Sequence, residues 1–294
     1  MTALRRLKNQ GSIPTAFCKE LINHMKDQTR FLTSTRRRLG LTLAACALLG
    51  FIALPVRAVD DNPAIDARAD ELLKRTGDYL GQAKFFSVSA EVWQDIQTAS
   101  GQRIQAGRNI DLQLRRPDRL HAEIHSPRRH RELIYDGKGI TLFNRADNLY
   151  GTAHVSGSLD DAMDVASEKF GIAMPLEDFL RSDPHKDLLR KTTSGKDIGP
   201  VTVMGVPCEH LAFSQENIDW QIWIENGARP VPRKFVITYK DEPGSPQFTA
   251  IFSDWDFITI LPDFVFKFEP PAGASKIKVK EMKIDLQSHK MEAK

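Results

Sequence analysis

The sequence of 294 residues has little cysteine and, beyond its first 58 residues, no excess of basic charge. Of its three cysteines only Cys208 lies beyond residue 58. A chain that keeps one cysteine forms no intrachain disulfide, which excludes a disulfide-stapled secreted scaffold. We expect Cys208, beside Pro207, to be buried and inert; a reactive thiol is the alternative.

The formal net charge of +3 comes from the first 58 residues, which hold 10 Lys and Arg against 2 Asp and Glu. The following 236 residues keep 31 of the 41 basic and 36 of the 38 acidic side chains, a net charge of −5. A nucleic-acid-binding surface needs a basic field that displaces counterions. Composition therefore gives no support to a nucleic-acid role.

One long uncharged apolar run, Leu39–Val56, directly follows three arginines. It ends at the small-x-small pattern Val56-Arg57-Ala58, so we predict a secretory signal peptide that is cleaved after Ala58 and directs the protein to the periplasm. A membrane anchor is the alternative, because roughly 18 apolar residues can just cross a bilayer. After cleavage we expect no membrane span in the remaining chain.

Three details of this leader, residues 1–58, stay open. The LAAC sequence that ends at Cys46 matches a lipobox, but the apolar run continues beyond it, which argues against lipidation. Residues 35–39 resemble a twin-arginine export motif, although the strong apolar run favours the general secretory route. Translation starts at Met1 or at Met25.

Periodicity divides the rest of the chain. Residues 63–80 repeat apolar positions every three or four residues, which predicts a helix. Six segments of period two within 85–154 predict an antiparallel meander, with a hairpin turn at Asp136-Gly137. Helical spacing returns in an insert, 159–191. Six further strands follow from Gly199, the last being DFVFKFEP at 263–270, and KIKVKEMKI at 276–284 could add an edge strand.

This order predicts a mainly β (α+β) fold with a single large curled antiparallel sheet, a half-barrel of ten to twelve strands. A sheet of that size curls, and only the N-terminal helix and the insert 159–191 are available to cover its concave apolar face. Residues 59–294 are therefore expected to form one domain. An apolar cavity between a curved sheet and loosely fitted helices is a common type of small-molecule site.

Short turn and strand sequences resemble those of two related protein families. RPDRL at 116–120, YDGK at 135–138 and LFN at 142–144 resemble the bacterial lipoprotein-carrier superfamily (LolA/LppX-like), whose members hold acyl chains in a half-barrel closed by helices. WQIWIE at 220–225 and FKFEPPAGA at 266–274 are similar to a predicted periplasmic domain-of-unknown-function family, number two thousand and ninety-two in its series. The resemblance implies fold and compartment; function follows only by analogy with the carriers.

Alternation places large apolar side chains on one face of the predicted sheet, and helical spacing brings others toward it. Burial of acyl surface by these residues would drive ligand binding at roughly 25 cal/mol per Å². The predicted ligand-binding residues are Phe86, Val88, Leu112, Leu114, Ile124, Leu142, Met163, Phe170, Phe179, Trp220, Ile222, Phe235, Ile237 and Phe252. Three further apolar residues are assigned to the other face, namely Trp223, Ile224 and Val236, so which face is concave stays open.

The polar residues of one predicted strand are candidates for a metal site. His121 and His125 flank Glu123, but four residues span roughly 13 Å along an extended strand. The two imidazoles are then too far apart to share one ion unaided. We expect a solvated strand face and no bound metal.

Two other constellations also have ordinary explanations. Asp160, Asp161 and Asp164 crowd a helix start, where carboxylates interact favourably with the helix dipole, and no Gly-containing calcium loop accompanies them. Cys208 and His210 share one side of a strand without an oxyanion-hole sequence. We therefore expect neither catalysis nor a cofactor.

The basic residues Arg128, Arg129 and Arg131 cluster at a predicted turn. They form either a solvated turn or a contact for an envelope protein or an anionic headgroup. Met163 and Met174 supply adaptable contacts in the insert, which we expect to open more easily than strands 218–240.

Two functions of different class remain. The first is a periplasmic carrier or sensor that binds a lipid-like hydrophobic ligand, such as an acyl chain, in a cavity between the sheet and the helices. The alternative is an envelope protein–protein interaction module whose core is filled by its own side chains. Empty apolar volume beside the sheet would favour the carrier.

Overall fold

The computed structural model of the protein describes residues 64–98, 100–127, 129–170 and 176–278. Its helices are α2 (Ala67–Gln82), α3 (Leu159–Phe170), α4 (Glu177–Leu180), α5 (Pro184–Leu189) and the 3-10 helix η1 (Asp263–Phe266). Its strands are β1 (Phe85–Gln97), β2 (Arg103–Arg115), β3 (Arg119–Ser126), β4 (Arg129–Tyr135), β5 (Gly139–Asn144), β6 (Leu149–His154), β7 (Ser194–Val203), β8 (Val206–Ser214), β9 (Ile218–Glu225), β10 (Pro232–Tyr239), β11 (Gln247–Asp256) and β12 (Ser275–Lys276).

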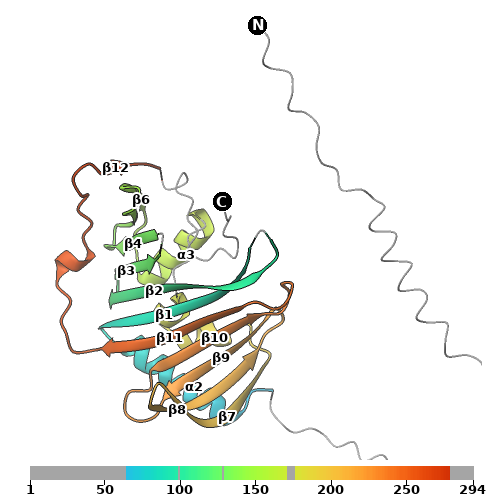
Figure 1. Cartoon of the computed structure of the whole chain (residues 1–294). Coiled ribbons are helices and arrows are strands. Elements are labelled where there is room, and N and C mark those ends of the chain that lie inside the picture. Colours follow the sequence, from blue (N-terminus) through green and yellow to red (C-terminus); the bar gives the residue numbers. More distant parts are fainter. Residues whose placement is uncertain (1–63, 99, 128, 171–175, 279–294) are drawn as a thin grey trace, which may run out of the picture. The chain divides into compact units, whose positions relative to one another are not determined.

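The strands form one sheet with the order β12-β6-β5-β4-β3-β2-β1-β11-β10-β9-β8-β7 (Figure 1). Within the described residues the sheet is open, with β12 and β7 as its edges. The predicted curled half-barrel is confirmed, and the six predicted strands of 85–154 are β1 to β6. One detail was wrong: the sheet is mixed, because the short edge strand β12 runs parallel to β6.

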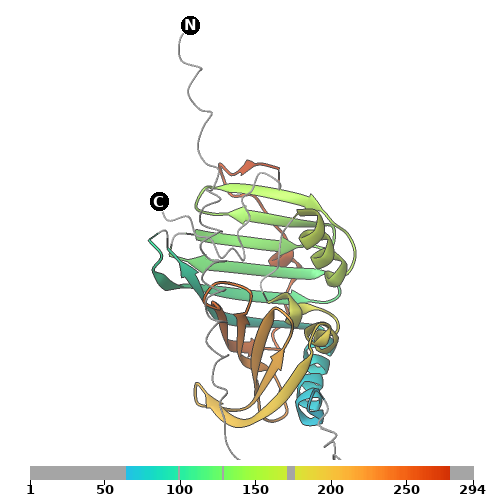
Figure 2. The same ribbon diagram turned by 90° about the vertical axis from the view of Figure 1, so that its right-hand side faces the viewer.

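Helices α2 to α5 pack on one face of the sheet, which we call the inner face; the opposite face is the outer face. Figure 2 shows α2, the short helices and α3 gathered along one side of the strands. Alternate residues of the strands and one stripe of each helix share a single hydrophobic core. In α2 the stripe consists of Ala69, Leu72, Leu73 and Leu80, the spacing that buries one helix face.

Helix α2 lies close against α5. A side-chain carbon on Gly77 would come within 2.7 Å of the backbone nitrogen of His185. Only glycine permits this approach. The His185 Nε2 lies 2.8 Å from the Asp70 carboxylate and fixes the same pair of helices.

The segment 257–274 follows β11; Phe257 still packs on Tyr79 of α2, and the chain then runs over the outer face to β12 (Figure 1). The prediction of a strand at 263–270 was wrong, because this segment contains η1 and then continues without pairing. It is held by side chains: the Arg115 guanidinium lies 5.1 Å from the ring centre of the buried Phe266, and Phe268 packs on Phe143. Burial of these rings competes successfully with strand pairing.

Candidate ligand-binding face

The predicted ligand-binding residues share one hydrophobic core. Twelve of the fourteen are buried in the core between the inner face and the helices, and Phe170 and Ile237 are half-buried and pack against it. The face that was predicted to be concave is therefore the one that the helices cover.

One residue was assigned to the wrong face. Ile224 lies on the inner face with Trp220 and Ile222, since all three occupy even positions of β9 and are buried. The outer face carries Trp223, which stacks on His210 at 4.2 Å between ring centres. Val236 is buried outside the main core.

A cavity of about 190 Å³ opens where α5 approaches β9 and β10. Its apolar wall includes Trp220, Phe235 and Ile237, three of the predicted ligand-binding residues. Four charged residues also line it, namely Asp178, Asp187, Arg190 and Lys191. Apolar and charged side chains therefore line the cavity together.

Two polar groups of this cavity are perturbed. The indole Nε1 of Trp220 is buried and has no hydrogen-bond partner among the described residues, although a buried donor normally has one. Burial raises the pKa of Asp178; Arg181 opposes the shift and Asp187 adds to it. The Asp178 carboxyl consequently holds its proton to a higher pH than an exposed aspartate.

The insert rests on the inner face through one aromatic side chain in particular. Phe179 of α4 makes edge-to-face contacts with Phe235, at 5.1 Å and 87°, and with Phe252, at 5.6 Å and 80°. Met163 of α3 is fully buried in the same core. Met174 lies outside the described residues.

The predicted aspartate cluster at the start of α3 has structural roles. Asp161 accepts hydrogen bonds from the backbone and the hydroxyl of Ser158, and these bonds lower the pKa of Asp161. Asp160 accepts from the backbone of Ser182, with an N–O distance of 3.0 Å. Asp164 pairs with Arg181 at 2.9 Å. The carboxylates thus cap α3 and tie it to the loop after α4.

Cys208 is buried, as predicted. Burial raises the pKa of its thiol, so the thiolate that would react is disfavoured. His210 does not activate it: the imidazole Nε2 lies 3.0 Å from Gln221 Oε1. Burial lowers the pKa of His210, and the nearby Lys234 adds to that effect.

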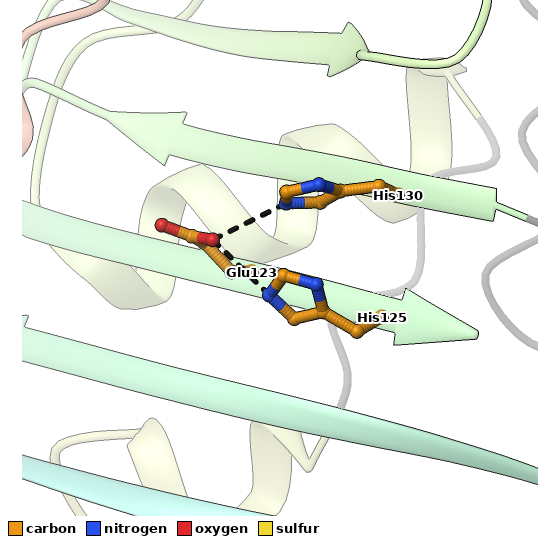
Figure 3. A group of neighbouring side chains, drawn as sticks. All are labelled: Glu123, His125 and His130. Atoms are coloured by element: carbon orange, nitrogen blue, oxygen red, sulfur yellow. Dashed lines mark hydrogen bonds and ion pairs between the residues drawn. The ribbon is translucent and has the colours of Figure 1, made fainter. Parts of the chain in front are cut away.

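The structure brings His130 together with Glu123 and His125. His125 and His130 are opposite one another on β3 and β4, and both place Nε2 3.2 Å from Glu123 Oε2 (Figure 3). The spacing within one strand does not indicate His130, but a hairpin at 126–129 pairs it with His125. His121 Nε2 stands apart, 3.8 Å from Glu123 Oε1.

The predicted basic contact is only partly described. Arg129 is exposed at the start of β4, and Arg128 lies outside the described residues. Arg129 and Arg131 alternate with His130 along the strand, so the pleat directs them to the face opposite to the imidazole.

No helix within the described residues is long and apolar enough to cross a membrane. A comparison with curated proteins finds no match.

Solved structures resemble the chain at low identity. The lipoprotein LppX of Mycobacterium tuberculosis is 12% identical, with 67% of this chain and 100% of that chain covered and a TM-score of 0.42. A protein from Thermus thermophilus is 12% identical, with 72% and 99% covered and a TM-score of 0.43. A LolA superfamily protein from Nitrosomonas europaea is 10% identical, with 68% and 97% covered and a TM-score of 0.37.

A protein-family model also matches the chain. The model of the family described as predicted periplasmic protein (DUF2092) matches residues 69–280, from α2 to beyond β12. The chain therefore belongs to the DUF2092 family of predicted periplasmic proteins.

Proposed function

We propose that this protein is a periplasmic carrier or sensor that binds a lipid-like hydrophobic ligand between the inner face and the insert, without catalysis. The observation that carries the proposal is the cavity beside α5, which apolar core residues and charged residues line together. Export by the leader, with cleavage after Ala58, belongs to the same proposal.

The size of the cavity sets a condition on binding. Its volume of about 190 Å³ is below the roughly 300–1,000 Å³ that is typical of small-molecule sites. An acyl chain must therefore displace side chains of the insert from the inner face. Phe179 is the side chain whose withdrawal would extend the cavity toward Phe252, because it contacts both Phe252 and the cavity wall at Phe235.

The polar groups suggest which end of the ligand stays at the cavity. The buried indole N–H of Trp220 has no partner among the described residues, and Arg190 and Lys191 line the cavity together with Asp178 and Asp187. A carboxylate accepts a charge-assisted hydrogen bond from such donors. A fatty acid with its headgroup at the cavity and its chain along the inner face satisfies both features.

Gentle purification from the periplasm, native mass spectrometry and organic extraction test the proposal directly. Saturable binding of a fluorescent fatty acid should follow removal of any bound lipid. Ile237→Glu replaces an apolar side chain of the cavity wall by a charged one and should weaken binding at least about tenfold, since it removes apolar surface against which an acyl chain would be buried. Thr238→Glu, one residue along β10 and on the outer face, is the matched control and should bind normally.

Two results would reject the carrier. They are the absence of co-purifying lipid combined with no saturable fatty-acid binding, and equal binding by the Ile237→Glu and Thr238→Glu variants. A folded Ile237→Glu variant, judged by an unchanged near-ultraviolet circular dichroism spectrum, is required for the second comparison.

A second function is favoured by one observation. The segment 257–274 exposes three large apolar side chains, Ile258 at 83%, Ile260 at 77% and Phe264 at 74%. Exposed apolar side chains that are grouped in this way mark protein contacts. An envelope interaction module would lose its partner in Phe264→Ser while fatty-acid binding remained unchanged; exposed Arg129 is a further contact in this case.

A further inference from the structure

The outer face carries a cluster that is separate from the ligand-binding face. Glu123 and His125 lie on β3, and His130 lies opposite His125 on β4. The three side chains are partly exposed, at 33%, 41% and 29% respectively. They are accessible to a dissolved ion and still held by the two strands.

The donor atoms converge. Both imidazole Nε2 atoms lie 3.2 Å from the same carboxylate oxygen of Glu123, and all three donor atoms fall within 4.8 Å of one another. Donors around a tetrahedral zinc ion, each at about 2.0 Å from the metal, are about 3.3 Å apart. Two of the three separations already match this value. Figure 3 shows the two rings turned toward the carboxylate.

The strand pairing holds this geometry. The His125 and His130 rings lie 4.0 Å apart with an interplanar angle of 38°, so each restricts the other. The neighbouring Glu132 is neutralised by an ion pair with Arg145. The basic residues Arg129 and Arg131 point to the other side of the pleat, so they do not compete with a cation for the Glu123 carboxylate.

His121 places a buried imidazole nitrogen near the Glu123 carboxylate. His121 Nε2 has no hydrogen-bond partner among the residues that the structure describes, and it stands 3.8 Å from Glu123 Oε1. When Glu123 binds an ion through Oε2, a small approach of the two groups lets His121 donate to Oε1. A second partner of this kind orients a metal-binding carboxylate.

An adjoining groove offers access. It has a volume of about 340 Å³ and is lined by Glu123 and His121 together with Asp111 and Asp254. Asp254 adopts a left-handed conformation, φ 53°, beside a register shift between β1 and β11. Bulges of this type redirect side chains near functional sites.

We infer that Glu123, His125 and His130 form a binding site for a divalent transition-metal ion, best suited to Zn²⁺, with an open coordination position toward the groove. Two imidazoles and one carboxylate are a donor set that zinc accepts, and three protein ligands leave room for water or a further ligand. His121 is a positioning residue that acts through Glu123. The site is independent of the proposed hydrophobic ligand.

Isothermal titration of the exported protein, purified without a polyhistidine tag, with ZnCl₂ tests the inference. One ion should bind per chain. His125→Ala, His130→Ala and the isosteric Glu123→Gln should each weaken binding at least about tenfold, and His121→Phe should weaken it by about tenfold through loss of the second partner. His154→Ala removes an exposed histidine of β6 and should bind as the unchanged protein does.

Substitution by Co²⁺ adds a readout of geometry, since tetrahedral Co²⁺ absorbs visible light far more strongly than the hydrated ion. That absorption should disappear in Glu123→Gln. The inference is overturned if no saturable Zn²⁺ binding occurs, if His154→Ala weakens binding as much as His125→Ala does, or if the folded Glu123→Gln variant binds normally. An unchanged thermal midpoint verifies the fold of each variant.

Discussion

Replacing Phe179 by alanine should release the insert from the inner face. Phe179 is only 2% exposed and meets Phe235 and Phe252 edge to face. Removal of a buried phenylalanine side chain costs about 3–5 kcal/mol, and each aromatic pair contributes about 0.5–1.5 kcal/mol beyond its buried area. If the insert opens separately from the sheet, the substitution lowers the free energy of opening the insert by this amount.

The expected magnitude follows from the lower estimate. A loss of about 3 kcal/mol changes an equilibrium constant by roughly 100-fold. Amide hydrogen exchange measured by mass spectrometry should therefore accelerate by about that factor in peptides from 159–191, while strands 218–240 keep their protection. In the unchanged protein the insert should already exchange faster than those strands.

Phe266→Ala is the matched control. Phe266 is fully buried, but it belongs to the segment 257–274 on the outer face, where it contacts Arg115. Its loss should destabilise the protein without selective exchange in 159–191. The reasoning is refuted if Phe179→Ala lowers the thermal midpoint as Phe266→Ala does and leaves exchange of the insert equal to that of the sheet, since the insert would then unfold only with the whole domain.

Three further predictions concern processing and pH. N-terminal sequencing of the exported protein should begin at Val59; an intact run from Leu39 to Val56 in the membrane fraction would contradict cleavage. Because the pKa of Asp178 is raised by burial, the native state binds more protons than the unfolded state above the ordinary value of 3.8, and stability declines as the pH rises through the raised pKa. Asp178→Asn should remove this decline in urea titrations from pH 4 to 8, and an unchanged slope would count against it. The pKa of His210 is lowered by burial, so the native state binds fewer protons than the unfolded state and stability is lost as the pH falls through the ordinary value of 6.5. His210→Gln should flatten the stability profile around that pH, whereas a profile that matches the unchanged protein would refute the assignment.

Local pattern was sufficient for most of the architecture. The period of two in 85–154 determines six strands, because neighbouring strand residues point to opposite faces. The three- and four-residue spacing of Leu72, Leu73 and Leu80 determines the buried stripe of α2. The size of the sheet then requires a cover, and the sequence contains only two helical regions to supply it.

Local pattern failed where distant side chains compete with backbone pairing. Residues 263–270 alternate like a strand, yet Phe266 and Phe268 are held on the outer face by Arg115 and Phe143. The sequence also does not indicate which strand an edge strand pairs with. β12 pairs in parallel with β6, from which it is separated by more than a hundred residues of chain.

The sequence by itself determined the candidate leader, the alternating apolar face and the scarcity of thiols, since each depends on residues that are neighbours in the chain. Tertiary structure decided which side chains meet. His125 and His130 converge on Glu123 only because β3 and β4 pair in one register, and a shift by one residue would send His130 to the opposite face. The cavity at Trp220 likewise depends on where α5 comes to rest against β9 and β10, a packing choice among many apolar contacts that no local pattern specifies.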